Sequence, residues 1–139
     1  MMSQADPSDE SGCSYESAVD FDSHNGWVFV CVVGQLAQHS IISVMRKARA
    51  VCESEDCYRI LIDVRNSTIK TSFIEAYMVA RKFSELTGLD QRFRCAFLYD
   101  ARTYSRQRAE TMTTITGNWD VTQICAFERF EDASEYLKR

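Results

Sequence analysis

Charged and amide side chains that could bind an anionic group follow two apolar, strand-like runs of the sequence, residues 60–62 and 94–99. In open α/β sheets, ligands and partners bind outside the carboxyl ends of the strands. These side chains therefore predict a site for a small anionic ligand or a partner protein, and an ordinary polar rim of the sheet is the alternative interpretation. The candidates are Asp63, Arg65, Asn66, Asp100 and Arg102.

Two hydroxyl groups, those of Thr71 and Ser72, stand where a polar loop over residues 64–71 is expected to meet the start of a helix. A phosphate group on Ser72 would suit the free N–H groups and the dipole of a helix N-terminus. The alternative is that Ser72 is a plain N-cap, because Glu75 stands three residues later and would complete a capping box. Thr71 and Ser72 therefore join the binding candidates, with Ser72 as a candidate phosphorylation site.

No catalytic or cofactor motif accompanies these residues. The sequence has no glycine-rich phosphate loop and no serine in a nucleophile-elbow context. Its two histidines, His24 and His39, lack metal-ligand spacing to a cysteine, so we expect neither a metal site nor another cofactor. Asp63 and Asp100 could work as an acid pair only if the fold brought them close together. We therefore expect no catalytic residues and a protein that is not an enzyme.

Composition and charge are those of one ordinary globular domain. The chain has 139 residues, 45% of them hydrophobic and 26% charged, with a net charge of −4. The first 24 residues contribute −6 and the remainder +2, which gives no indication of nucleic-acid binding. The sequence shows neither an apolar run long enough to span a bilayer nor a signal-peptide pattern. We therefore expect a cytoplasmic protein with reduced cysteines and no transmembrane segment.

Hydrophobic periodicity predicts strands and helices after a flexible acidic tail over residues 1–14. The Asn25-Gly26 pair, a strong signal for a tight hairpin turn, separates the first two strands. The predicted strands cover residues 15–21, 27–33, 58–63, 94–99 and 121–127, and the predicted helices cover residues 40–52, 72–87, 105–116 and 130–137. This order predicts one α/β domain over residues 15–139, with a mixed, mostly parallel five-stranded sheet and an antiparallel N-terminal edge strand.

Four local matches make residues 15–139 resemble the STAS superfamily, in particular the bacterial SpoIIAA-like proteins of the STAS/SEC14 type. The strand over residues 27–33 is followed by Gly34-Gln35-Leu36 and a helix that begins with a serine, which resembles the family's opening strand and turn. Ile60-Leu-Ile-Asp63 resembles the strand before the family's functional loop. Phe93-Arg94-Cys-Ala-Phe-Leu resembles its next strand, and Phe130-Glu-Asp-Ala133-Ser-Glu-Tyr-Leu137 resembles its closing helix.

The resemblance implies a SpoIIAA-like fold and a non-catalytic regulatory role that works through protein–protein interaction. In the anti-sigma-factor-antagonist branch, a phosphorylatable serine stands in an Asp-Ser-Ser-Gly context between a strand and a helix. The corresponding stretch here is Lys70-Thr71-Ser72-Phe73, which keeps a hydroxyl group but lacks the Asp and the Gly. The alternative that the resemblance allows is a carrier of a small ligand or lipid, like SEC14 proteins, with a pocket between helix and sheet.

Charge and edge patterns suggest which partners the domain could bind. Five arginines between residues 92 and 108 could attract an acidic partner protein, a phosphate group or an anionic lipid head group, or form an ordinary solvated face. The acidic residues 1–24 could also lie across these arginines within the same chain. A homodimer is a further expectation, because a hairpin at a sheet edge can pair with its twin.

Overall fold

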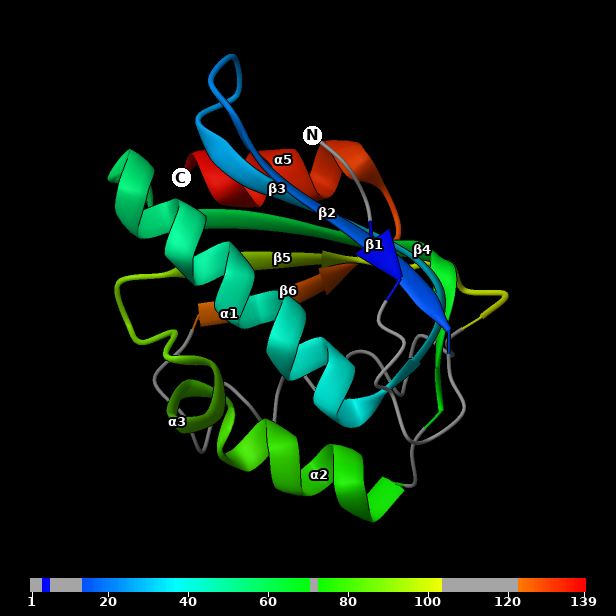
Figure 1. Cartoon of the computed structure of the whole chain (residues 1–139). Coiled ribbons are helices and arrows are strands. Elements are labelled where there is room, and N and C mark those ends of the chain that lie inside the picture. Colours follow the sequence, from blue (N-terminus) through cyan, green and yellow to red (C-terminus); the bar gives the residue numbers. More distant parts are fainter. Residues whose placement is uncertain (1–3, 6–13, 71–72, 104–122) are drawn as a thin grey trace.

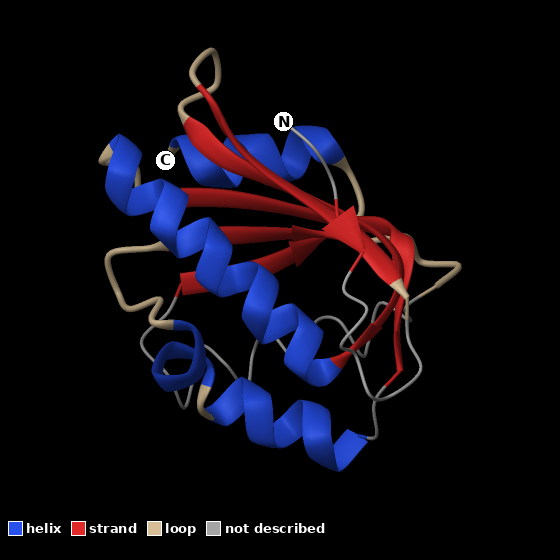
Figure 2. Ribbon diagram, in the orientation of Figure 1, coloured by secondary structure: helices blue, strands red, loops and turns tan. Residues whose placement is uncertain are grey.

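The computed structural model of the chain describes residues 4–5, 14–70, 73–103 and 123–139 (Figure 1). These residues form a six-stranded sheet with helices on both faces (Figure 2). The strands are β1 (Gln4–Ala5), β2 (Tyr15–Asp22), β3 (Trp27–Ala37), β4 (Arg59–Lys70), β5 (Arg94–Leu98) and β6 (Gln123–Phe127). The helices, labelled as in Figure 1, are α1 (Gln38–Glu55), α2 (Phe73–Arg81), α3 (Phe83–Thr87) and α5 (Phe130–Lys138).

The strands lie in the sheet in the same order as in the sequence, from β1 to β6. β2 is antiparallel to both β1 and β3, and the pairs β3–β4, β4–β5 and β5–β6 are parallel. The predicted mixed, mostly parallel sheet is thereby confirmed, with all five predicted strands present. The two-residue β1 is not predicted from the sequence; it lies within residues 1–14 and pairs with the outer edge of β2. The predicted helix over residues 105–116 lies outside the described residues.

Successive side chains of the strands fill two separate hydrophobic clusters, one on each face of the sheet. α1 and α3 pack over one face, where Val28 of β3 and Ile60 of β4 are buried. α5 packs over the other face, where Trp27 and Leu61 meet Leu137. Neighbouring residues of one strand belong to different clusters because strand side chains alternate between the two faces.

β3 continues beyond its predicted end because Gly34 lets two strands approach closely. Gly34 has a φ of +114°, and a Cβ atom there would lie 2.6 Å from the carbonyl oxygen of Ser14 and 2.9 Å from Cα of Tyr15. Gln35 donates its backbone N–H to the same Ser14 oxygen at 2.8 Å. The glycine therefore marks a close contact between β2 and β3, whereas the sequence pattern places the end of the strand there.

β4 has 12 residues, about twice its predicted length, because a β-bulge interrupts its alternation. Cys31 of β3 pairs with Asp63, but Val33 pairs with Asn66, so β4 carries one residue more than β3 over this interval. A single inserted residue shifts the phase of the alternation and makes a strand look like an irregular polar segment. The predicted polar loop over residues 64–71 is therefore wrong, since all of it up to residue 70 belongs to the strand.

The predicted second long helix is divided into α2 and α3. Lys82, with φ −116° and ψ 22°, leaves helical geometry between them. α3 packs against α1 and buries Phe83, whereas α2 leaves Ile74 and Met78 exposed. Gly88 ends α3 in the left-handed conformation. In the described part of the chain, none of the helices combines the length and the apolar character that a membrane span requires.

Two arginines at the amino ends of β4 and β5 satisfy the last carbonyl groups of α5. Arg59 donates to the carbonyl oxygen of Arg139 at 3.1 Å, and Arg94 donates to the same oxygen at 2.8 Å. Arg94 also donates to the carbonyl oxygen of Tyr136 at 3.2 Å. The final carbonyls of a helix lack intrahelical partners and carry partial negative charge, so these cations stabilise that end of α5 and tie it to the sheet.

The described part of the acidic leader does not lie on the arginines near the start of β5. β3 and β4 separate β2 from β5, and β1 extends the sheet farther in the opposite direction. Arg92 instead forms an ion pair with Asp90 at 3.0 Å. The proposed docking of residues 1–24 on these arginines is therefore not observed for the described residues, and Arg106 and Arg108 lie outside them.

Replacing Gly34 by alanine should lower the free energy of unfolding by about 3 kcal/mol or more, because the new Cβ meets backbone atoms of β2 at an unfavourable φ. Gly26→Ala is the matched control. Gly26 also has a positive φ, +78°, but no atom lies within 4 Å of its added Cβ. Its expected cost is about 1 kcal/mol. Urea unfolding measures both losses, and equal losses would contradict the close contact between β2 and β3.

Candidate functional site

Asp63 and Arg65 form a closed ion pair within β4. The carboxylate of Asp63 accepts the backbone N–H of Arg65 at 3.0 Å, its Nε at 3.0 Å and its Nη2 at 2.9 Å. The side chain of Asp63 is only 9% exposed and that of Arg65 is 45% exposed, so a buried carboxylate holds a guanidinium group that reaches solvent. The side-chain hydrogen bonds to Asp63 raise the pKa of Arg65, so its guanidinium group stays charged.

Asp100 and Arg102 repeat the same arrangement just after β5. Asp100 accepts the backbone N–H of Arg102 at 2.9 Å, its Nε at 3.1 Å and its Nη2 at 2.7 Å. The hydrogen bonds from Arg102 lower the pKa of Asp100 to about 2, so the carboxylate stays ionised far below neutral pH. The side chain of Arg102 is 91% exposed, which makes it a cation held in place at the surface.

The register of the sheet joins the two ion pairs into one row. Asp63 pairs with Leu98, the last residue of β5, and two residues later come Arg65 on β4 and Asp100 just beyond the end of β5. The direct hydrogen bonds are the largest cause of the pKa shifts of Arg65 and Asp100. In addition, the charge of Asp100 raises the pKa of Arg65, and the charge of Arg65 lowers the pKa of Asp100. We call this alternating series the clamp row. It begins at a buried carboxylate and ends at an exposed guanidinium group, and its members are Asp63, Arg65, Asp100 and Arg102.

A third pair, Asp90 and Arg92, shows that this clamp is encoded locally. Asp90 accepts the backbone N–H of Arg92 at 2.9 Å and its Nε at 3.0 Å. All three pairs have the sequence Asp-x-Arg, and this spacing is the signal by which sequence reasoning could have found the pairing. The third pair lies before β5, at the opposite end of the sheet from the clamp row. It therefore serves as a natural comparison for the other two.

The remaining predicted site residues do not all join the clamp row. Asn66 lies exposed on β4 just after the bulge, beside the row. Thr71 and Ser72 lie outside the described residues, so the capping box that Ser72 would form is not described either. Glu75 stands in the first turn of α2, as a capping box would require. Because β4 continues to Lys70, Asp63 and Arg65 lie within the strand and not at the start of the helix.

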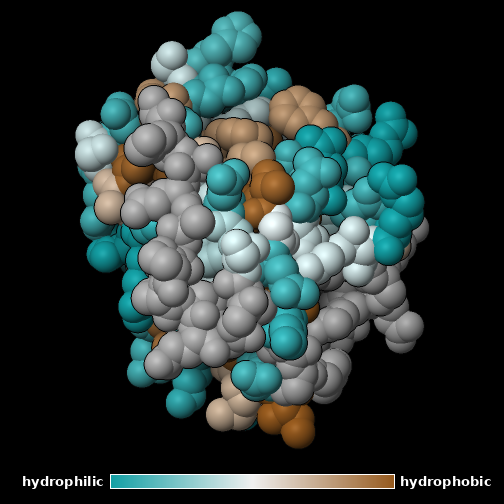
Figure 3. Space-filling view, turned by 45° about the vertical axis from the view of Figure 1, so that its right-hand side comes forward, coloured by the Kyte–Doolittle hydropathy of each residue, from teal (hydrophilic) through white to brown (hydrophobic). Residues whose placement is uncertain are grey.

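α2 carries an apolar surface that the sequence analysis did not single out. Ile74 is 73% exposed and Met78 is 50% exposed, and residues four apart on a helix share one face. The sequence of the predicted helix contains the signal for this surface, which is two large apolar residues four positions apart. Only the division between α2 and α3 shows that this face of the helix is left uncovered. Figure 3 shows the molecule from the side on which the strands end, where hydrophobic side chains reach the surface in an upper group and at the lower end.

An apolar cavity of about 60 Å³ lies between the sheet and the helices α1 and α3. Val32 and Ile62 of the sheet, Val44 of α1 and Phe83 of α3 are among the described residues that line it. Pockets that hold drug-sized ligands measure roughly 300–1,000 Å³ and contain a few polar groups that orient the ligand. The described lining here is entirely apolar, and the cavity is too small for a lipid chain.

The groups of the clamp row and the thiol beside it show no arrangement typical of proton or group transfer. Arg65 stands between Asp63 and Asp100, so these two carboxylates do not form an acid pair that shares a proton. Burial, followed by the charge of Asp63, raises the pKa of the nearby Cys31 thiol, which disfavours the reactive thiolate. Among the residues that the structure describes, no group of three or more His, Cys, Asp or Glu side chains is placed to hold a metal ion.

Comparison with known proteins shows similarity at the level of structure. No protein-family model matches the chain, and no curated protein matches its sequence. The crystal structure of an anti-sigma factor antagonist from Mycobacterium paratuberculosis is similar over 91% of this chain and 96% of that chain, with a TM-score of 0.59 and 13% identity. An uncharacterized protein from the DUF3478 family with a SpoIIAA-like fold, from Shewanella loihica PV-4, is similar over 90% of this chain and 94% of that chain, with a TM-score of 0.53 and 16% identity.

These two structures cover nearly the whole chain, and their low sequence identity means that they establish the fold and not the activity. The antiparallel opening strand, the parallel strands that follow it and the helices on both faces agree with that fold. The chain therefore has a SpoIIAA-like α/β fold, as the resemblance of its sequence predicts.

Proposed function

We propose that this chain is a non-catalytic regulatory module of the cytoplasm that works by binding another protein. The observation that carries the proposal is the exposed apolar pair Ile74 and Met78 on α2. The clamp row adds charged groups that could orient a partner. The similarity in fold to an anti-sigma factor antagonist supports a protein as the ligand, since such a protein is by its description a regulator of other proteins.

The exposed pair on α2 fits a hydrophobic groove of a partner. A large apolar side chain that remains 73% exposed gains little from its own fold, and two such side chains on one helix face can be buried together by a partner. Amphipathic helices commonly bind in this way, with anchors four residues apart. Burial of Ile74 and Met78 would each contribute on the order of 1–2 kcal/mol to association.

The outer end of the clamp row fits an anionic group of the same partner, either a carboxylate or a phosphate. Arg102 uses its Nε and one Nη2 hydrogen for Asp100, which leaves further N–H groups of the guanidinium for a partner. Because Asp100 already holds this side chain, less conformational entropy is lost when a partner binds it. A charge of this kind mainly sets the orientation and the rate of association.

The other functions considered from the sequence have less support. A carrier of a lipid would need a much larger cavity than the one of about 60 Å³ that described residues line between α1 and the sheet. An enzyme would need convergent reactive groups, whereas both carboxylates of the clamp row are occupied by arginines. Phosphorylation of Ser72 remains a proposal for how binding is regulated. Intact-mass analysis of the protein purified from its own cells, followed by peptide mapping, tests it.

Ile74→Glu should strongly weaken binding of the partner, because a carboxylate would enter the apolar contact that α2 makes. The tagged full-length chain is used to capture proteins from a lysate of its own cells, and captured proteins are identified by mass spectrometry. A protein that the unmodified chain captures and the variant loses is then purified, and its dissociation constant is measured by calorimetry. We expect the constant to rise at least about tenfold in the variant.

Lys47→Glu is the control, because Lys47 is exposed on α1 and the substitution also adds negative charge. It should bind the captured protein as the unmodified chain does. The proposal fails if no protein is captured specifically, or if the two variants bind equally well.

Arg102→Ala should weaken the same complex by about two- to fivefold, with the difference shrinking as salt is added. Asp100→Asn keeps the positive charge of Arg102 but weakens the hydrogen bonds that hold its side chain in place, so the affinity for the partner should fall less. Because the pKa of Asp100 is lowered to about 2, its carboxylate is ionised at every working pH, and the loss of affinity should not vary between weakly acidic and neutral buffers.

Arg92→Ala is the control, because it removes the equivalent arginine at the opposite end of the sheet and should leave the affinity for the partner unchanged. Equal losses for Arg92→Ala and Arg102→Ala would contradict a role for the clamp row.

A further inference from the structure

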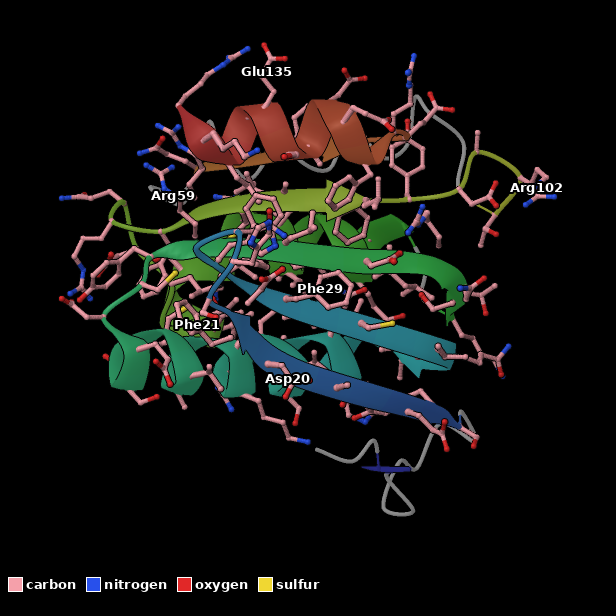
Figure 4. All side chains as sticks on the ribbon, turned by 90° about the horizontal axis from the view of Figure 1, so that it is seen from above. Asp20, Phe21, Phe29, Arg59, Arg102 and Glu135 are labelled. Atoms are coloured by element: carbon pink, nitrogen blue, oxygen red, sulfur yellow. The ribbon has the colours of Figure 1, made fainter. Side chains whose placement is uncertain are left out.

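The sheet face on which α5 lies is covered over only part of its width. α5 packs against β4, β5 and β6, and it reaches β3 through Phe130, whose ring centre lies 6.2 Å from that of Trp27. Over the rest of β2 and β3, none of the described helices lies on this face, because α1 packs against the opposite one. Figure 4 looks onto this open half, with Asp20 on β2 and Phe29 on β3 in view and α5 lying beside them.

The open half presents an apolar row along β3. Phe29, Cys31 and Val33 point to this face, because the intervening Val30 and Val32 belong to the cluster under α1 and side chains alternate along a strand. Phe29 and Cys31 are half-buried, and Val33 is 45% exposed. Apolar side chains in the middle of a sheet normally lie beneath another layer of the protein. The row therefore indicates a layer that the described part of the chain leaves incomplete.

The open half has the width of one helix. β5 is the middle one of the three strands under α5 and lies two strands away from β3. A second helix above β3 would therefore lie roughly 10 Å from α5, which is the usual distance between packed helices. A second sheet does not fit in this layer, because α5 already covers Leu61 of β4, the strand next to β3.

The apolar row also has the length of a short helix. From Phe29 to Val33 the strand rises about 13 Å, and a helix of three turns is about 16 Å long. Apolar residues three and four positions apart form a single stripe along such a helix. A short amphipathic helix is therefore the element that matches the uncovered area in both width and length.

Acidic residues border the apolar row on its outer side. On β2, Glu16 pairs with Val33 and Asp20 pairs with Phe29, and both acidic side chains are exposed. These carboxylates disfavour a nucleic acid or an anionic membrane surface as the ligand of this face, because like charges repel. They favour a protein helix that carries Lys or Arg on the flank next to β2.

We propose that the open half binds a helix of another protein, which lies beside α5 and completes the helical layer on this face of the sheet. The helix has about three turns, an apolar stripe that covers Phe29, Cys31 and Val33, and Lys or Arg residues on the flank toward β2. Its docking buries the apolar row and enlarges the smaller of the two hydrophobic clusters. α2 packs against α1 and α3 on the opposite side of the sheet, so this surface is separate from the one formed by Ile74 and Met78.

Photo-crosslinking from position 33 tests the proposal. The purified full chain carries benzoylphenylalanine in place of Val33 and is irradiated in a lysate of its own cells, and the linked peptides are identified by mass spectrometry. We expect links to one segment of another protein, with apolar residues three and four positions apart and Lys or Arg on one flank. The same photo-crosslinker in place of Lys47, which is exposed on α1, is the control and should not link to that segment.

A synthetic peptide with the sequence of the linked segment then gives the affinity. Val33→Glu should raise the dissociation constant at least about tenfold, because it places a carboxylate in the apolar row. Asp20→Lys should raise the constant less, and the difference should shrink as salt is added. Ile74→Glu is the matched control, because it places the same charge on an exposed apolar residue of α2 and should leave the constant unchanged.

The proposal is overturned if position 33 gives no link, if position 47 links to the same segment equally well, or if the linked segment lacks the amphipathic and basic pattern. A link to a second copy of the chain overturns it as well, since it would indicate self-association through this face. If Val33→Glu does not fold, the exposed Asp20 decides, and an affinity that Asp20→Lys leaves unchanged contradicts the proposal. Because Ile74→Glu tests α2 and Val33→Glu tests the open half, either surface can fail while the other stands.

Discussion

The buried carboxylate of Asp63 is the constraint on which the middle of this structure depends. A carboxylate that is 9% exposed must be paired and hydrogen-bonded, and here one residue, Arg65, supplies a backbone N–H and two guanidinium N–H groups. The bulge that follows resets the alternation of β4, so that Ser67 and Ile69 return to the side of the core. The same few residues of β4 thereby form the charged site and determine which side chains of this longest strand face the core.

Apolar runs and turn signals predicted most of the fold, and the failures have identifiable physical causes. The presence of the five main strands and of the closing helix follows from the periodicity of their apolar residues. The second half of β4 escaped detection because one inserted residue breaks that regularity. Gly34 predicts the end of a strand, because glycine at a strand end and glycine at a close backbone contact look the same in a sequence. The break at Lys82 has no local signal, since lysine favours helices.

The candidate site was predictable as a set of residues and less so as an arrangement. The Asp-x-Arg spacing is local and could have been recognised, but it also occurs at residues 90–92, so it does not by itself locate a site. That Arg65 lies beside Asp100 depends on the register of β4 and β5, which no single strand encodes. The exposure of Ile74 and Met78 likewise depends on where α2 gives way to α3, which is a property of the packed protein.

The two faces of the sheet are stabilised very unequally. In the described part of the chain, 17 buried residues form the cluster under α1 and α3, whereas six form the cluster under α5. Detachment of α5 therefore breaks the smaller cluster and the hydrogen bonds from Arg59 and Arg94, while the larger cluster stays intact. We therefore expect α5 to detach as a separate cooperative unit before the chain unfolds globally. Trp27 would become exposed to solvent when α5 detaches, so its fluorescence would report this local unfolding.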